Sequence, residues 1–361
     1  MVFEEEGRVS LRVISHKGTK EDTKARGFLS AFVSSFVPLC ETAFLLLIFM
    51  AGVASAQQQP VHIDPNKFAV IINGPGGEPT YAHQFEQWTE QLRSTLAEKF
   101  GFDRRNIRIL SQKGDAPATA DGVRKTFVDL KSQLDANNAL FVFLIGHGSF
   151  DGKESKFNLV GPDLSASEYN VLLTSLPTRR VVVFNMASAS GEFIKSLAAK
   201  GRIVITATRN GQETNATRFT GFFIAALNAA DADTDQDGHT SVLEAFVYAN
   251  RLTEDFYKRA GRLASEHALL DDNGDGVGHD KLEAGEGLLA RATYLDSLSG
   301  DEAAATAATG RLMKERTRLE GEIEQLIARK TNMPEAEYEA TLERLFIELA
   351  KVNRSIKQAR T

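Results

Sequence analysis

The stretch Val181-Val-Val-Phe-Asn-Met-Ala-Ser-Ala-Ser-Gly191 is an apolar run that breaks abruptly into small residues. A similar stretch upstream, Ala139-Leu-Phe-Val-Phe-Leu-Ile-Gly-His-Gly-Ser149, ends in glycines around a histidine. Both runs are too short to span a membrane, and both have the continuous apolar character of parallel strands buried on two faces. Ligands of open α/β sheets bind beyond the carboxyl ends of such strands. We therefore expect His147 and Ser188 to face one another in a crevice there.

The surrounding region alternates strands with helices. Further short strands are predicted at Phe68–Ile72, Ile107–Leu110 and Ile203–Ala207. Helices are predicted at 81–100, 120–134, 172–176, 192–199, 219–229 and 242–257. Parallel neighbours need crossovers of about this length. The pattern predicts an α/β domain over residues 67–287, with a doubly wound, mostly parallel sheet and helices on both faces.

The C-terminal region, residues 288–361, has a different periodicity. Apolar residues recur three and four positions apart in two stretches, on either side of Asn332-Met333-Pro334. The residues are Leu312, Leu319, Ile323 and Leu326, then Tyr338, Leu342, Leu345, Leu349, Val352 and Ile356. This spacing predicts an antiparallel, coiled-coil-like helical hairpin, which typically serves packing or self-association.

The N-terminal segment has the form of a signal peptide. A charged leader precedes an apolar run, 42–53, which is followed by Ala54-Ser55-Ala56, a small-x-small cleavage sequence. Residues 1–56 are therefore predicted to be removed, with a polar linker at 57–66 and a secreted or periplasmic mature protein without a stable membrane span. A retained anchor beginning near Phe28 is the alternative, although Glu41 would lie inside it.

Composition excludes some classes of function. The chain has 361 residues and a net charge of −6, and its basic residues form no aromatic-interleaved patch, so nucleic-acid binding is not expected. The one cysteine, Cys40, lies in the leader. The mature chain would then contain neither a disulfide nor a cysteine nucleophile.

Three short motifs carry a resemblance to a known family. They are Tyr81-Ala82-His83-Gln84 after the first strand, Gly146-His147-Gly148 after a central strand, and Ala187-Ser188-Ala189-Ser190-Gly191 after the next. Together they resemble the caspase-legumain group of cysteine peptidases, specifically the legumain-like (C13-like) peptidases. The resemblance covers about residues 68–215 and implies a caspase-like fold.

The departures from that family are equally informative. The resemblance places Ser188 at the position of the catalytic cysteine, and Thr80, Ala82 and Met186 where legumains hold assisting or pocket residues. The charge pattern of the legumain pocket is therefore absent. A preference for cleavage after asparagine is not supported.

The serine leaves several functions open. His147 could take a proton from Ser188, with the backbone N–H groups of Gly148 and Ser188 as oxyanion donors. A serine hydroxyl needs a well-aligned base and an orienting third group, and no acidic residue near these motifs supplies one. The leading hypothesis is an inactive homologue that binds a peptide or protein segment. The alternatives are an active serine hydrolase, a scaffold acting through the C-terminal hairpin, and an unrelated α/β domain in which both residues only pack.

The most specific motif is an acidic loop with the full twelve-residue calcium pattern. Carboxylates stand at positions 1, 3 and 5, glycine at 6, a backbone carbonyl at 7, and a glutamate at 12. These positions belong to Asp233, Asp235, Asp237, Gly238, His239, Ser241 (position 9) and Glu244. The sequence predicts a Ca²⁺ site here, more plausibly structural than catalytic.

A second acidic loop begins in the same way but ends irregularly. Asp271, Asn273 and Asp275 precede Gly276, whereas position 12 is Leu282 and Glu283 comes one residue late. A second Ca²⁺ site would need water or another carboxylate, such as Asp280, to complete its shell. The neighbouring His267 is expected to be structural, because calcium prefers oxygen ligands. The two loops define a calcium-loop region at 231–283.

Overall fold

The computed structural model describes residues 61–113, 116–234, 239–281 and 286–296, and most of 311–360. The predicted signal peptide, its alternative anchor and Cys40 lie outside these residues. So do Asp235 and Asp237 of the first acidic loop. In the part of the chain that is described, no helix combines the length and apolar character needed to cross a membrane.

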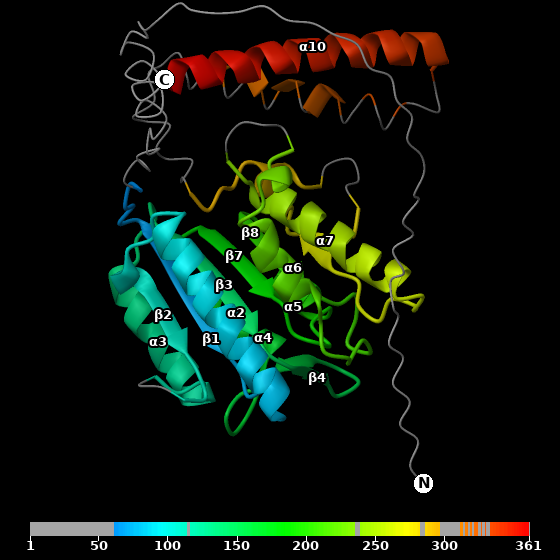
Figure 1. The fold of residues 1–361 in the computed structure, drawn as a ribbon. Coiled ribbons are helices and arrows are strands. Elements are labelled where there is room, and N and C mark those ends of the chain that lie inside the picture. Colours follow the sequence, from blue (N-terminus) through cyan, green and yellow to red (C-terminus); the bar gives the residue numbers. More distant parts are fainter. Residues whose placement is uncertain are drawn as a thin grey trace, which may run out of the picture. The chain divides into compact units, whose positions relative to one another are not determined.

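A six-stranded sheet forms the centre of the α/β body (Figure 1). Five strands are parallel, and the sixth pairs antiparallel at one edge. In spatial order they are β2 (Ile107–Leu110), β1 (Lys67–Asn73), β3 (Ala139–Ile145), β7 (Arg180–Asn185), β8 (Arg202–Thr206) and β9 (Leu269–Asp271). All seven residues of β1 and of β3 are buried, as the continuous apolar runs predict. The prediction of an α/β fold with a mostly parallel sheet is confirmed.

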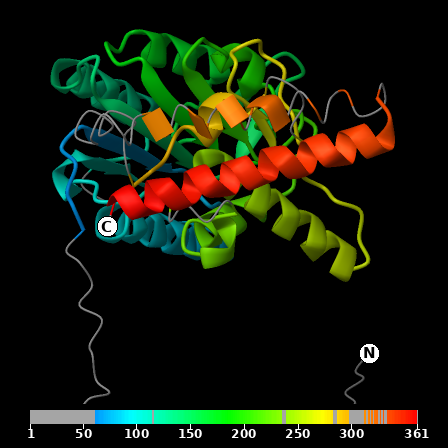
Figure 2. The same cartoon turned by 90° about the horizontal axis from the view of Figure 1, so that it is seen from above.

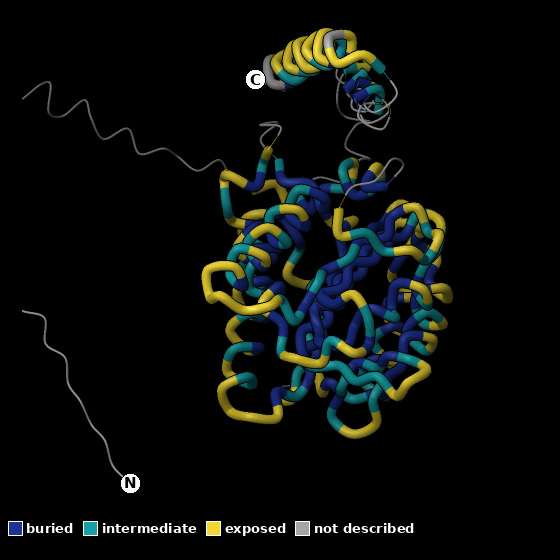
Figure 3. The backbone as a smooth tube through the Cα atoms, turned by 90° about the vertical axis from the view of Figure 1, so that its right-hand side faces the viewer, coloured by how far each residue is buried: buried dark blue, intermediate teal, exposed yellow. Residues whose placement is uncertain are grey.

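Helices pack on both faces of this sheet, because its side chains alternate between two separate apolar clusters. Ile71 and Phe143 face the cluster that contains helices α2 (Pro79–Glu98), α6 (Phe219–Ala226) and α7 (Val242–Arg259). Val70 and Val142 face the cluster that contains α3 (Ala120–Gln133), α4 (Ala166–Thr174) and α5 (Phe193–Leu197). Buried backbone lies in the interior of the body, and exposed segments lie at its outside (Figure 3).

A small three-stranded antiparallel sheet follows His147. It is made of β4 (Gly148–Phe150), β5 (Ser155–Phe157) and β6 (Leu164–Ser165), with β4 at one edge. Such short strands leave no periodic signal in the sequence. Helix α4 begins at Ala166, earlier than predicted, because Ser165 and Glu168 form a capping box that starts it.

The segment after the second acidic loop belongs to the same core. The short helices η1 (Arg104–Asn106), η2 (Ala230–Ala232) and α8 (Leu288–Arg291) complete the body. Ala290 and Leu295 are fully buried among the residues that pack on α2 and α6. The fully buried Lys67 ammonium donates to the carbonyls of Leu295 and Asp296, at 3.0 and 3.1 Å. Residues 288–296 therefore pack as part of the α/β body.

The C-terminal region contains a long helix, α10 (Glu335–Arg360), seen along its length in Figure 2. Residues that are described between Arg311 and Leu326 are also helical. Leu319, Ile323 and Leu326 pack with Tyr338 and Leu345 of α10 in a third apolar cluster. These are residues that the heptad-like spacing selects.

Candidate functional site

His147 and Ser188 follow the ends of two neighbouring parallel strands. Residue Leu144 of β3 is paired with Asn185 of β7, so the chain leaves both strands at the same edge of the sheet. The backbone N–H of Gly148 then donates to the hydroxyl of Ser188 at 3.2 Å. The predicted juxtaposition of the two motifs is present in the structure.

His147 is held by the loop after β1 and by α2. Its Nε2 lies 3.3 Å from the carbonyl oxygen of Gly76. The rings of Tyr81 and Phe85 meet the imidazole edge-on, with centroids 5.2 and 5.1 Å away. A backbone carbonyl thus supplies the orienting partner that no acidic residue supplies. Tyr81 of the Tyr-Ala-His-Gln motif therefore contacts His147 directly. His83 of the same motif bonds Gln87 on the exposed side of the helix.

Ser188 is engaged by Gly148 and not by His147. The side chain accepts from Gly148 N at 3.2 Å and lies 3.4 Å from the Gly148 carbonyl, to which it donates. Only 2% of the serine is exposed. No hydrogen bond joins His147 to Ser188, both of which are described residues. One predicted oxyanion donor, the N–H of Gly148, is therefore bonded to the hydroxyl that would act as nucleophile.

The turn after Ser188 is fixed by buried hydrogen bonds. Ala189 has φ 52°, the one positive value for a non-glycine residue in the described part of the chain. The Thr208 hydroxyl accepts from the backbone N–H groups of Ser190 and Gly191, at 2.7 and 3.1 Å. At Gly191 a Cβ would lie 2.3 Å from the backbone of Arg209 and Asn210, so no larger residue fits. This turn is buried and densely packed.

The residues at the altered legumain positions offer no charge to this site. Met186 is fully buried, and its carbonyl accepts from Thr217 and Thr220. Thr80 is exposed at the start of α2, and Ala82 packs its backbone against Gly76.

The first acidic loop is described at its two ends. Glu244, the predicted twelfth position, accepts from the backbone N–H and the hydroxyl of Thr234, at 2.8 and 2.9 Å. Its other oxygen accepts from the backbone and hydroxyl of Ser241, both at 2.9 Å, in the capping box that starts α7. Asp233 lies at the entrance of the loop, and His239 bonds Asp296 at 2.5 Å. Glu244 is thus placed to close the loop.

The second acidic loop leaves β9 directly. Asp271 is fully buried and accepts from the backbone of Gly274 and Gly276, at 2.8 and 3.1 Å. Burial raises the pKa of its carboxyl group. The Asn273 side chain meets Glu286 at 2.5 Å. Sequence reasoning missed Glu286, which lies four residues beyond the regular closing position.

No group of three or more His, Cys, Asp or Glu side chains is already drawn together around a metal position among the residues described. The described ligand candidates are instead held by hydrogen bonds from the backbone and from amides. The Ca²⁺ assignments of both loops therefore remain predictions.

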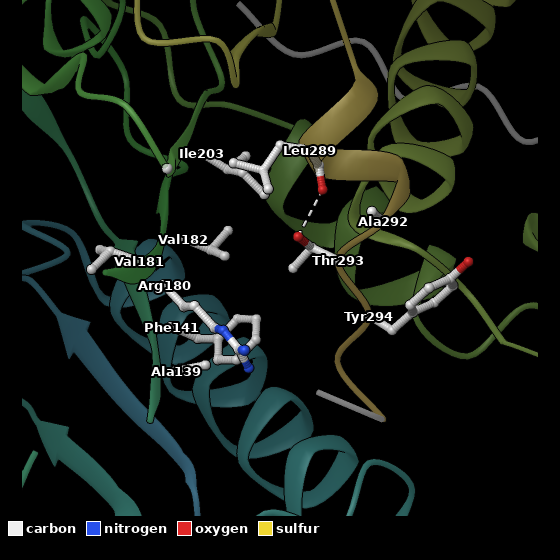
Figure 4. Close-up of a pocket in the computed structure, with 11 residues that line it drawn as sticks. Ala139, Phe141, Arg180, Val181, Val182, Ile203, Leu289, Ala292, Thr293 and Tyr294 are labelled. Atoms are coloured by element: carbon white, nitrogen blue, oxygen red, sulfur yellow. Dashed lines mark hydrogen bonds between the residues drawn. The ribbon is translucent and has the colours of Figure 1, made fainter. Parts of the chain in front are cut away.

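Two cavities lie away from His147 and Ser188. One, of about 120 Å³, opens at the amino ends of β3, β7 and β8. Its lining includes Phe141, Val182 and Ile203 from the strands, and Leu289 lies next to Ile203 (Figure 4). The other, of about 310 Å³, lies beside α7 and reaches Glu266 and His267. The first is at the opposite end of the strands from the candidate site.

Comparison with known proteins does not assign this chain to a family. No protein-family model matches the sequence, and no curated protein matches it either. The function has to be argued from the site itself.

Proposed function

We propose that the chain is an exported, legumain-like peptidase homologue that does not cleave peptides but binds a peptide or protein segment beside His147. The observation that carries this proposal is the pairing of Ser188 with Gly148. Ser188 is 2% exposed, and its hydroxyl is bonded to the Gly148 backbone at 3.2 and 3.4 Å. A nucleophile needs access to substrate and to its base. This serine is arranged as a structural residue.

The architecture supports the family assignment within the proposal. A doubly wound, caspase-like sheet requires helices on both faces and functional loops after adjacent central strands, and the order β1-β3-β7-β8 offers such a frame. His147 follows β3 and Ser188 follows β7, as in the legumain-like motif order. Fold alone does not carry activity when the nucleophile has changed.

The edge strand β4 supports binding of an extended segment. Gly148–Phe150 forms one edge of its small sheet and is partly exposed. The N–H and carbonyl of Gly148 are bonded to Ser188, so a ligand would have to use the part of the edge beyond Gly148. Exposed sheet edges bind extended peptides by adding a strand, with side-chain pockets giving specificity. The partly exposed His147 and Tyr81 lie next to this edge and would contact the side chains of such a ligand.

An active serine hydrolase is the second candidate. The observation in its favour is the Gly76 carbonyl, which faces Nε2 of His147 and can fix the tautomer with a proton there. The other ring nitrogen would then be the base. Activity would still require the Ser188 hydroxyl to leave Gly148.

A third candidate is a scaffold that self-associates through a C-terminal helical hairpin. The apolar cluster of Leu319, Ile323 and Leu345 supports the hairpin, and Phe346 and Ile347 on α10 are half exposed. Light scattering tests this candidate, because a monomer at micromolar concentration would exclude it.

Calcium binding at the first acidic loop is part of the proposal. The Glu244 carboxylate already closes the loop onto Thr234 and Ser241. In an exported protein, millimolar calcium would load such a site continuously and stabilise the start of α7. Titration calorimetry should show weaker calcium binding in Glu244→Gln, and unchanged binding would remove the assignment.

A fluorophosphonate probe separates the inactive homologue from the hydrolase. The purified protein, with and without calcium, should remain unlabelled, and a mixed peptide library should bind without being cleaved. Labelling that disappears in Ser188→Ala but persists in the neighbouring control Ser190→Ala would overturn the proposal. Gain of peptide cleavage in Ser188→Cys would show a frame that lacks only its thiol. Peptide binding should weaken in His147→Ala.

A further inference from the structure

The loop after β9 is wound around its first carboxylate. Asp271 accepts from Gly274 and Gly276, and Asp275 accepts from the backbone of Val277 at 2.7 Å. Gly274 and Gly276 have φ 80° and 79°, values that side chains disfavour. Acidic turns of this kind are common, so the loop alone does not define a site.

Glu286 gives the independent observation. It is 5% exposed, and its Oε2 is buried without any hydrogen-bond partner. Its Oε1 lies 2.5 Å from the Asn273 amide nitrogen, and the same nitrogen is 3.3 Å from Asp275 Oδ2. The two carboxylates therefore converge on one amide. A buried carboxylate oxygen without a donor is costly, and the carboxylate that carries it contacts the loop at Asn273.

The local charge balance is negative. Burial raises the pKa of Glu286, His279 opposes this shift, and Asp272, Asp275 and Asp271 add to it. His279 Nε2 is 3.6 Å from Glu286 Oε1. Asp272 is engaged elsewhere, because its oxygens accept from Gly287 and Ala290 at the start of α8. Asp271, Asp275 and Glu286 remain as three carboxylates around one loop.

We propose that this loop binds a calcium ion through Asp271, Asn273, Asp275 and the carbonyl of Val277, and that Glu286 closes the site. Carboxylate, amide and carbonyl oxygens are the ligands of a hard divalent cation, and calcium accepts the irregular geometry of a longer loop. Glu286 turns from Asn273 to the ion when it binds. The exposed side chains of Asn273 and Asp275 leave the loop open to solvent on one side.

Closure by Glu286 would fasten three elements together. Asp271 ends the edge strand β9, and Glu286 lies two residues before the start of α8. At Gly274 a Cβ would lie 2.6 Å from the backbone of Ala199, so the loop rests on the turn between α5 and β8. The site thus stabilises the antiparallel edge of the sheet. This inference goes beyond the proposed function and does not depend on it, since neither Ser188 nor Glu244 contributes.

The test uses the full chain carrying Glu244→Gln, so that calcium binding at the first loop is weakened. Calcium alone is titrated by calorimetry, and thermal unfolding is followed with calcium or with a chelator. Glu286→Gln should weaken binding about tenfold or more and reduce the calcium-dependent rise in Tm accordingly. The matched control Asp280→Asn changes an exposed carboxylate of the same loop and should leave the affinity within about twofold. With chelator present, Glu286→Gln should be at least as stable as its parent.

Several results would overturn the site. They are absence of calcium binding in the Glu244→Gln parent, unchanged affinity in Glu286→Gln, or loss of binding in Asp280→Asn. Tighter binding of zinc that disappears in His279→Ala would assign a different metal. If Glu286→Gln does not fold, Asp275→Asn, at an exposed position, should show the same loss of calcium affinity, and unchanged affinity there would also overturn the site.

Discussion

Two regions each bury a glutamate, but they treat its carboxylate differently. Glu266 is 3% exposed and accepts from the backbone of Arg218 and Phe219 and from the Tyr257 hydroxyl, at 2.8 to 3.0 Å. Glu286 is 5% exposed, and one of its oxygens has no partner. The first glutamate closes the N-terminus of α6, where the N-cap residue makes no side-chain hydrogen bond.

For these two buried glutamates, the difference separates a carboxylate that its own surroundings satisfy from one that is left with an unpaired oxygen. Buried polar groups in folded proteins almost always have hydrogen-bond partners, so complete satisfaction needs no ligand. The same criterion applies to Ser188, whose hydroxyl is satisfied by Gly148. Glu286 departs from the rule, because its Oε2 has no hydrogen-bond partner, and this is why we propose a cation there. Both glutamates have little exposed surface, and their hydrogen-bond partners differ.

The largest expected effect is on the satisfied glutamate. Glu266→Ala should lower the free energy of unfolding by about 3 kcal/mol, because backbone N–H groups at the start of α6 and the Tyr257 hydroxyl lose their acceptor. Chemical denaturation measures this loss. Glu254→Ala, which removes a half-exposed carboxylate on α7, is the control and should cost less than about 1 kcal/mol. A loss of stability in Glu266→Ala no larger than in Glu254→Ala would contradict the view that Glu266 is a structural carboxylate and Glu286 is not.

The turn after Ser188 should show the next largest effect. Thr208→Val keeps the side-chain shape but removes the acceptor for the N–H groups of Ser190 and Gly191. The expected loss of stability is about 2 kcal/mol, from two buried donors left without partners. Thr174→Val at the end of α4, where the hydroxyl of the exposed Thr174 bonds Asn170, is the control. Equal stabilities of the two variants would mean that the turn is not held by this network.

Much of the sheet was predictable from the sequence, because its central strands are continuous apolar runs. β1, β3, β7 and β8 coincide with the predicted strands within one or two residues. β9 has only three residues and is a strand because it pairs with β8, so no local sequence pattern predicts it. The same reason hides β4, β5 and β6.

The candidate site was predictable only in position. The strand-end rule brings His147 and Ser188 to one edge, and the structure confirms this arrangement. That Gly148 would take the Ser188 hydroxyl could not be predicted, since it depends on the path of the backbone after β3. The contact of Glu286 with the second acidic loop could not be predicted for a related reason. The twelve-residue calcium pattern places the closing ligand at position 282, whereas the folded chain brings Glu286, four positions later, to Asn273.

The smallest predicted effect is a pH dependence that arises from Glu266. Burial raises the pKa of its carboxyl group above the ordinary value of 4.5, and the hydrogen bonds from Phe219, Arg218 and Tyr257 oppose the shift without reversing it. The folded state therefore holds the proton more tightly than the unfolded state, so stability from this group is present at acidic pH and is lost as pH rises through the raised pKa. Asp103 and Asp151, whose pKa values are lowered to about 2 by hydrogen bonds, act in the opposite direction at lower pH. The free energy of unfolding of wild type and of Glu266→Gln is measured by denaturation between pH 4.5 and 7. Subtracting the variant's value from the wild-type value removes the contribution of Asp103 and Asp151, which both proteins share. The difference, wild type minus variant, should increase as the pH falls. If this stability difference stays flat or decreases as the pH falls, the hydrogen bonds to Glu266 lower its pKa by more than burial raises it. Its carboxylate would then be stabilised more completely by its partners, and its contrast with Glu286 would be larger.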